Sequence, residues 1–160
     1  MRIIAGMYKG RKLSAPKNDA RPTLDRTKET LFNILQFMVA GRDVLDIFAG
    51  SGALGLEAIS RGARSAAFVD SDQKSVDAVK KNCELVGCHA NIIKADYAQA
   101  LARLRPARFG LVFVDPPYGQ DLCPRCLELL CAHGLLTGDA VVACEHERDS
   151  ELPEKIACLV

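Results

Sequence analysis

The residue types and spacing most suggestive of chemistry are those of Asp115-Pro116-Pro117-Tyr118, which directly follow an apolar run over residues 110–114. The two prolines fix φ and remove two backbone donors, and each disfavours a helical conformation in the residue before it. The chain must therefore leave the predicted strand as a rigid segment in which hydrogen-bond acceptors outnumber donors. The Asp115 carboxylate and the Pro116 carbonyl could accept both hydrogens of an amino group, while Tyr118 could stack on an attached ring.

The exocyclic amine of a nucleobase would suit such a segment. Its nitrogen is a poor nucleophile because the lone pair is delocalised into the ring, and two acceptors holding its N–H bonds would favour the pyramidal, reactive form. The same four residues could instead be a turn that ends a strand, which is the common use of Asp and Pro. The segment alone leaves both interpretations open.

Short apolar runs alternate with helical patterns along most of the chain. Strands are expected at 44–48, 65–69, 90–94, 109–114 and 140–144, and helices at 25–39, 51–61, 72–86, 97–104 and 122–132. In the first helix, Leu31, Ile34, Leu35 and Met38 should form the apolar face. This alternation, without two-residue hairpin turns, predicts a doubly wound α/β domain with a mostly parallel, Rossmann-like sheet and helices on both faces. Ligands then bind at the carboxyl ends of the strands.

A glycine-rich segment, Gly50-Ser51-Gly52-Ala53-Leu54-Gly55, lies between the first predicted strand and its helix. The first two glycines permit a tight turn and close approach of a ligand, and the third permits helix and strand to pack together. Asp70 follows at the end of the second strand, where a carboxylate can bind both hydroxyls of a ribose. The spacing therefore predicts an adenosine cofactor.

Two cofactor classes fit this spacing, a nicotinamide dinucleotide and S-adenosylmethionine. A dinucleotide site holds a pyrophosphate at the helix N-terminus and gains nothing from a nearby carboxylate. Asp46 lies four residues before Gly50, and its charge would repel phosphate but attract an ammonium or sulfonium group. We therefore favour S-adenosylmethionine. Asp96, at the end of the third strand, could accept from the adenine amine or simply cap the helix that begins at Tyr97.

Composition restricts the class of protein. With 160 residues, of which 49% are hydrophobic and 26% charged, the chain is expected to be one folded body. No apolar run is as long as a membrane span and no signal peptide is recognisable, so a cytoplasmic protein is expected. Seven scattered cysteines favour reduced, buried thiols over a disulfide framework. Cys123 and Cys126 are expected to pack in a helix face, so no metal site is predicted.

Charge is distributed unevenly. Residues 1–28 hold eight basic and two acidic side chains, whereas the remainder holds thirteen basic and eighteen acidic ones. We interpret residues 1–24 as a basic arm or small hairpin that contacts a polyanion and residues 25–160 as the enzyme-like body, although a solvated tail would have the same composition. The candidate RNA-binding residues are Arg2, Lys9, Arg11, Lys12 and Arg26.

These motifs together resemble a known family. Asp46-Ile47-Phe48-Ala49-Gly50-Ser51-Gly52 with Asp115-Pro116-Pro117-Tyr118 is similar to the motifs of class I methyltransferases that act on exocyclic amines of bases. The N-terminal residues Arg2-Ile3-Ile4-Ala5-Gly6, Lys9-Gly10-Arg11-Lys12-Leu13 and Arg21-Pro22-Thr23 narrow the resemblance to the RsmD family. Members of that family methylate the N2 amine of a guanine in small-subunit (16S) ribosomal RNA.

The resemblance implies that Asp115 and the Pro116 carbonyl orient the guanine amine beside Pro117, and that Tyr118 stacks on the base. It implies a cofactor set comprising Asp46, Phe48, Ala49, Gly50, Ser51, Gly52, Asp70, Ser71, Asp96, Tyr97, Arg21 and Thr23. The expected partner is small-subunit ribosomal RNA or the assembling small subunit, with no membrane or metal, and the protein is expected to be a monomer. The final strand pair of the family is expected to be abbreviated here. An adenine-N6 methyltransferase and a non-catalytic RNA-binding assembly factor are the alternatives.

Overall fold

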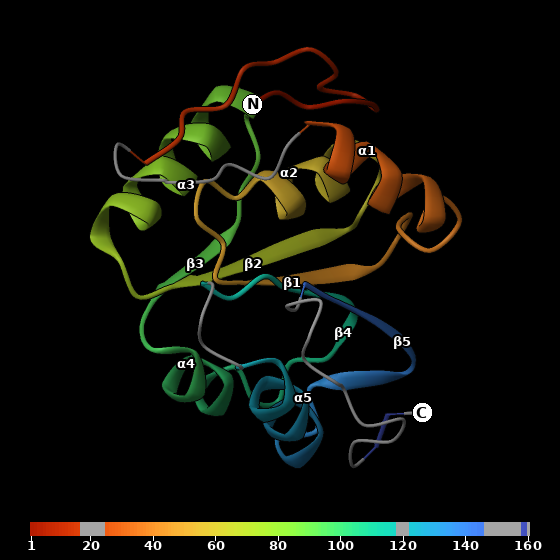
Figure 1. Cartoon of the computed structure of the whole chain (residues 1–160), viewed down its shortest axis with the longest axis vertical. Coiled ribbons are helices and arrows are strands. Elements are labelled where there is room, and N and C mark those ends of the chain that lie inside the picture. Colours follow the sequence, from red (N-terminus) through yellow and green to blue (C-terminus); the bar gives the residue numbers. More distant parts are fainter. Residues whose placement is uncertain (17–24, 118–121, 146–157, 160) are drawn as a thin grey trace.

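A computed structural model describes residues 1–16, 25–117, 122–145 and 158–159. Five parallel strands form one sheet in the order β3-β2-β1-β4-β5 (Figure 1). The strands are β1 (Asp43–Ile47), β2 (Ser65–Asp70), β3 (Asn91–Lys94), β4 (Phe109–Val114) and β5 (Leu136–Cys144). The helices are α1 (Asp25–Ile34), α2 (Ala53–Ser60), α3 (Gln73–Val86), α4 (Tyr97–Arg103) and α5 (Cys123–Ala132).

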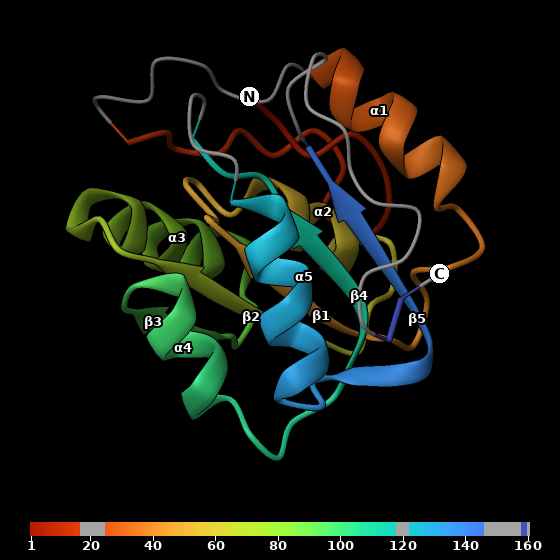
Figure 2. The same cartoon turned by 60° about the horizontal axis from the view of Figure 1, so that its bottom comes forward.

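Helices cover both faces of the sheet. Figure 1 shows α1, α2 and α3 above the sheet and α4 and α5 below it, and Figure 2 brings the lower pair forward. The strands serve both layers because their side chains alternate between faces. Along β1, Val44 belongs to the core under α1–α3, whereas Leu45 and Ile47 belong to the core under α4 and α5. The predicted doubly wound α/β fold is confirmed.

The strand order reverses at β1. This strand pairs with β2 on one side and with β4 on the other, so the chain builds outward in one direction, returns, and then builds in the other. In doubly wound sheets the crevice outside the carboxyl ends of such a strand pair is the usual ligand site. The candidate residues at the ends of β1 and β4 therefore flank the position where a ligand is expected.

The N-terminal segment, defined here as residues 1–16, is folded back on itself. Arg2 and Lys12 form an antiparallel bridge. The Ile3 N–H donates to the Arg11 carbonyl at 3.0 Å, and the Ile3 carbonyl accepts from the Gly10 N–H at 2.8 Å. Ile3 and Leu13 are buried in the same core as α1–α3. This part of the predicted arm is thus a small hairpin packed on the helices above the sheet.

The first helix differs from the prediction. It ends at Ile34 rather than near Val39, and Ile34 and Met38, both expected in the apolar face, are 69% and 40% exposed. Leu35, just after the helix, is buried as predicted, whereas the buried residues of the helix itself are Lys28 and Phe32, and Val39 is buried further along the chain. The apolar pattern misassigned the face because Lys28 is buried by an ion pair with Glu57, and a lysine is normally assigned to solvent.

The expectation that all the cysteines are reduced is wrong for one pair, because Cys131 and Cys158 form a disulfide. The disulfide joins α5 to a residue 27 positions further along the chain. Local sequence patterns do not predict a contact over that separation. Cys123 and Cys126 pack in the core under α5, as predicted. The expected abbreviated strand pair falls on residues outside the described part. No helix in the described part is long and apolar enough to span a membrane.

Candidate active site

Strand register brings the predicted site residues to one edge of the sheet. Ile47 at the end of β1 pairs with Val69 of β2 and with Val114 of β4. The residues that come next along each strand are therefore neighbours across the carboxyl edge. They are Phe48 after β1, Asp70 at the end of β2, and Asp115 after β4. The cofactor motif and the Asp-Pro-Pro motif, far apart in the sequence, meet at this edge.

The glycine-rich loop turns sharply from β1 into α2. The Gly52 N–H donates to the Ala49 carbonyl at 2.6 Å, and Phe48 has a φ of 62°, which is strained for a residue with a side chain. A Cβ on Gly55 would lie 2.4 Å from the Phe68 ring of β2. Glycine is required there for the helix to lie against the strand, as the motif predicts.

Asp46 is buried below this loop. One carboxylate oxygen accepts a hydrogen bond from the Gly55 N–H at 2.8 Å, and the residue is 2% exposed. Burial raises the pKa of Asp46 to about 8, and the negative charges of Asp115 and Asp70 act in the same direction. The three carboxylates therefore influence one another, and a positively charged ligand would relieve their repulsion.

Asp70 holds the loop from the neighbouring strand. Its two carboxylate oxygens accept from the Gly50 N–H at 2.8 Å and from the Asp72 N–H at 2.9 Å. Partial burial raises the pKa of the Asp70 carboxyl. Each oxygen keeps a second lone pair, so the carboxylate can also accept from hydroxyl groups. Ser71, next in the chain, is exposed.

The side of the site next to α4 carries an aromatic pair. The rings of Phe48 and Tyr97 lie 5.4 Å apart at an interplanar angle of 48°, a favourable arrangement for two aromatic rings. Asp96 caps α4 by accepting from the Ala98 N–H at 2.9 Å. The helix-cap alternative for Asp96 is therefore present in the structure, and a role toward adenine remains a prediction.

A pocket of about 230 Å³ borders Asp115. Its walls come from α1, α2 and the ends of β4 and β5, and its lining is mainly apolar. The lining residues are Thr27, Lys28, Leu31, Leu54, Phe113, Val114, Asp115, Ala143, Cys144 and Glu145. Pro116 and Pro117 follow Asp115 directly, whereas Tyr118, Arg21 and Thr23 lie outside the described residues.

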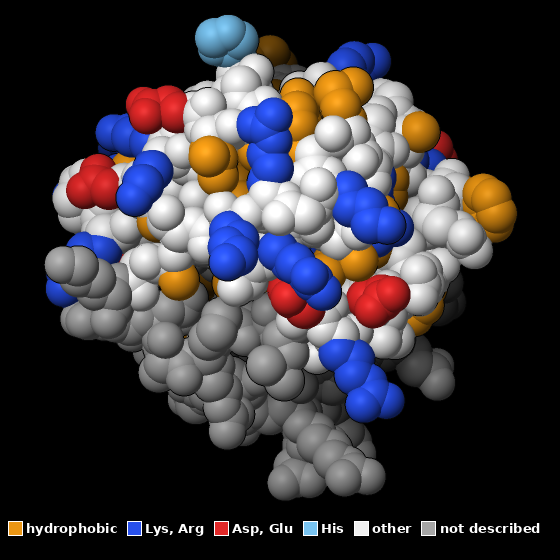
Figure 3. Space-filling view, turned by 90° about the horizontal axis from the view of Figure 1, so that it is seen from above, with side chains coloured by type: hydrophobic (Ala, Val, Ile, Leu, Met, Phe, Trp, Pro, Cys, Tyr) orange, Lys and Arg blue, Asp and Glu red, His pale blue; other side chains and the backbone are white. Residues whose placement is uncertain are grey.

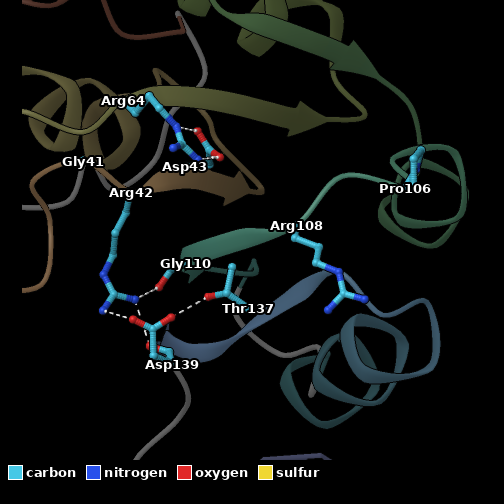
Figure 4. Close-up of a pocket in the computed structure, with 9 residues that line it drawn as sticks. All are labelled: Gly41, Arg42, Asp43, Arg64, Pro106, Arg108, Gly110, Thr137 and Asp139. Atoms are coloured by element: carbon cyan, nitrogen blue, oxygen red, sulfur yellow. Dashed lines mark hydrogen bonds and ion pairs between the residues drawn. The ribbon is translucent and has the colours of Figure 1, made fainter.

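A larger hollow of about 410 Å³ lies at the opposite edge of the sheet (Figure 4). Arg42 binds Asp139 at 2.9 Å and the Gly110 carbonyl at 2.7 Å, and Arg64 is paired with Asp43. These ion pairs link residues near the first residues of β1, β2 and β5. None of the predicted site residues is among those that line this hollow, so size alone does not identify the site.

The predicted RNA-binding residues, which are Arg2, Lys9, Arg11, Lys12 and Arg26, are all exposed. Figure 3 views the face above the sheet and shows Lys and Arg side chains spread over it with few acidic ones. Arg2 lies 3.7 Å from the Asp25 carboxylate, and the Arg11 guanidinium lies 5.4 Å from the Tyr8 ring centre. The hairpin thus presents its basic side chains outward while Ile3 and Leu13 anchor it.

Three buried polar residues near the site were missed by sequence reasoning. Lys28, Glu57 and Asn82 are each 0% exposed. The one available signal was a charged residue inside an apolar helical stretch, as for Glu57 in Leu54–Ile59. Such a residue is buried only when it is paired, and its partners come from distant segments.

Residues 1–160 match the model of a family described as Conserved hypothetical protein 95. The ribosomal RNA small subunit methyltransferase D of Escherichia coli strain K12 is 39% identical over 155 residues, covering 96% of this chain and 78% of that protein. A hypothetical protein of Thermus thermophilus, TTHA0928, superposes with a TM-score of 0.85 at 33% identity, covering 96% of this chain and 90% of that one.

The fold alone is shared with a more distant structure, the tRNA (uracil-54, C5)-methyltransferase of Pyrococcus abyssi in complex with S-adenosyl-L-homocysteine. Its TM-score is 0.53 at 24% identity, over 68% of this chain and 26% of that one. This chain thus shares its fold with a methyltransferase.

Proposed function

Because the chain belongs to the family described as Conserved hypothetical protein 95, we propose that it transfers a methyl group from S-adenosylmethionine to the N2 amine of a guanine in small-subunit ribosomal RNA. The coarser part, methylation of small-subunit ribosomal RNA, is supported by the E. coli relative of that name. The observation that carries the proposal is the position of Asp115, which lies beside the glycine-rich loop and borders the 230 Å³ pocket.

The residues around the loop fit S-adenosylmethionine. Asp46 is a buried carboxylate that forms no ion pair within the described residues, so a cationic ligand would lower the cost of ionising it. Asp70 lies at the end of the neighbouring strand, where its carboxylate can accept from ribose hydroxyls. The Phe48 and Tyr97 rings offer an apolar surface beside an adenine. A pyrophosphate would instead make ionisation of the buried Asp46 less favourable.

S-adenosylmethionine supplies a methyl group that is bound to a positively charged sulfur. When the methyl group is transferred, the sulfur becomes a neutral thioether. The contribution of the protein is to orient the acceptor and to stabilise charge. The Asp115 carboxylate and the Pro116 carbonyl accept from the two N–H bonds of the amine, which directs the nitrogen lone pair toward the loop. As the nitrogen becomes positive, the Asp115 carboxylate stabilises the charge and is the acceptor for the proton that is lost.

The pocket beside Asp115 supports binding of an unstacked base. Leu31, Leu54 and Phe113 provide apolar walls, and Asp115 lies among the lining residues. Removing a base from its stack costs a few kcal/mol. Contacts between the basic N-terminal segment and phosphates would offset that cost without reading sequence. The segment and the pocket share one side of the sheet, since both contact α1.

The test is methyl transfer from radiolabelled S-adenosylmethionine to small-subunit ribosomal RNA, offered as naked RNA and as partly assembled subunits. The product is digested to nucleosides and separated. We expect the label in N2-methylguanosine. Label in N6-methyladenosine would overturn the guanine assignment, and binding of RNA without transfer to any form would support the non-catalytic assembly factor.

A further inference from the structure

Asn82 is a fully buried side chain on α3 that contacts two separate segments. Its Oδ1 accepts from the Ser14 N–H at 2.8 Å, and its Nδ2 donates to the Ser14 carbonyl at 2.8 Å. The same Nδ2 donates to the Ser51 carbonyl at 2.9 Å. One acceptor bond and two donor bonds match the amide in only one orientation, because a flipped amide would place NH₂ against the Ser14 N–H.

The two partners of Asn82 belong to different parts of the proposed site. Ser51 lies in the glycine-rich loop expected to hold the cofactor. Ser14 lies at the end of the basic N-terminal segment expected to hold RNA. Met1, at the start of that segment, also approaches the loop, since its sulfur lies 3.6 Å from the Ser51 hydroxyl. The side chain of Asn82 therefore makes a direct connection between the two proposed binding elements.

The other end of the segment is held independently. The Glu57 carboxylate accepts from the Ile4 N–H at 2.8 Å and from the Ala5 N–H at 3.0 Å. It also binds Lys28 at 3.2 Å and Arg61 at 2.8 Å. These contacts fix the segment to α1 and α2. Unlike Asn82, Glu57 forms none of its described hydrogen bonds with residues 48–52, which make the cofactor turn.

We propose that Asn82 is a positioning residue that couples RNA binding by the N-terminal segment to cofactor binding by the loop. The inference rests on the proposed function. RNA that holds the segment fixes Ser14, and through the Asn82 amide it also restrains Ser51, so the loop loses less freedom when the cofactor binds. By linkage the effect is reciprocal, and the cofactor tightens RNA binding by the same factor.

A purely structural role for Asn82 makes a different prediction. Loss of three buried hydrogen bonds would lower the stability of the fold. It could also lower the affinity of the protein for the cofactor and for RNA, each measured separately. It would leave unchanged the ratio between cofactor affinity with RNA and cofactor affinity without RNA. That ratio is the quantity that distinguishes coupling from stabilisation.

The experiment measures the affinity of S-adenosyl-L-homocysteine by calorimetry, alone and with a saturating transcript of small-subunit ribosomal RNA. The proteins are wild type, Asn82→Ala, Asn82→Asp and Glu57→Gln. Asn82→Asp keeps an acceptor for the Ser14 N–H but loses both donor bonds, and it serves if Asn82→Ala does not fold. Glu57→Gln loosens the same segment without altering a bond to the loop. Thermal unfolding confirms that each variant is folded.

We expect RNA to tighten S-adenosyl-L-homocysteine binding at least about fivefold in wild type. The ratio should fall to about one in both Asn82 variants and should stay near the wild-type value in Glu57→Gln. An unchanged ratio in the Asn82 variants, or the absence of coupling in wild type, would overturn the inference. No step requires turnover, so a failure to methylate guanine would count against the proposed function alone.

Discussion

The carboxylate of Asp46 and the backbone N–H of Gly55 are joined by a 2.8 Å hydrogen bond beneath the glycine-rich loop. This bond spans the turn between β1 and α2, so it fixes the carboxylate where the loop begins. Burial favours the protonated form of the group, because it raises the pKa of Asp46 to about 8. The position of a buried acid next to a proposed cation site has consequences for both binding and stability.

Cofactor binding should release a proton. A sulfonium group near Asp46 lowers the pKa of the carboxyl, so the proton held in the ligand-free protein is lost on binding below about pH 8. Affinity for S-adenosylmethionine should therefore rise between pH 6 and pH 8. Calorimetry in buffers of different ionisation enthalpy measures the release. Asn in place of Asp46 should abolish it, and an equal release from Asp46→Asn would assign the proton to another group.

Stability should vary with pH in the opposite direction. The folded-state pKa of Asp46 lies above its unfolded value of 3.8, so the folded protein binds more protons between these two values and loses stability as the pH rises through them. Asp46→Asn should remove this dependence. Urea unfolding at pH 5 and pH 8 should show a smaller difference between the two pH values in the variant. The same difference in both proteins would contradict the assignment.

Gly6 should tolerate no side chain. Its φ is +81°, and a Cβ there would lie 1.8 Å from the Ser60 carbonyl oxygen, which accepts the Met7 N–H. Gly6→Ala should detach the N-terminal segment from α2 and weaken RNA binding. Gly10→Ala is the matched control, because its φ is +85° with nothing within 4 Å, so it should cost only about 1–2 kcal/mol of backbone strain.

Filter binding to small-subunit ribosomal RNA and urea unfolding compare the two glycine variants. Equal losses in both would mean that the contact with Ser60 does not hold the segment. A larger loss in Gly6→Ala is the expected result.

The buried pair Lys28–Glu57 should be costly to break from one side. Their charged groups lie 3.2 Å apart with both side chains fully buried, and desolvation lowers the pKa of Lys28. Lys28→Met removes one of the cationic partners of the buried Glu57 carboxylate. The substitution should therefore lower the free energy of unfolding by about 3–5 kcal/mol. The double variant Lys28→Met/Glu57→Gln should recover part of this loss in urea unfolding. Additive losses would show that the pair is not coupled.

Much of the fold follows from local patterns in the sequence. The strand at 109–114 was predicted with its observed limits, and the helix predicted at 72–86 is observed at Gln73–Val86, with Asp72 capping its start and Gly87 its end. These elements are predictable because their apolar spacing and end residues are local. The meeting of the glycine-rich loop with Asp115 was predictable too, since parallel strands present their carboxyl ends at one edge.

What local patterns miss is the burial of charge. Lys28 and Glu57 are separated by 29 positions in the chain, and both are buried where α1, α2 and the N-terminal segment meet. The same holds for Asn82, whose partners come from the N-terminal segment and the loop. The Cys131–Cys158 disulfide likewise depends on a contact between distant segments.

The most direct test of the central claim is single-turnover methyl transfer by wild type, Asp115→Ala and Asp115→Asn, with S-adenosylmethionine affinity measured on the same samples. If Asp115 holds the amine of the base, both variants should lose transfer to small-subunit ribosomal RNA by about 100-fold or more, while cofactor affinity changes little. Transfer at the wild-type rate in either variant, or loss of transfer explained entirely by lost cofactor binding, would contradict the account.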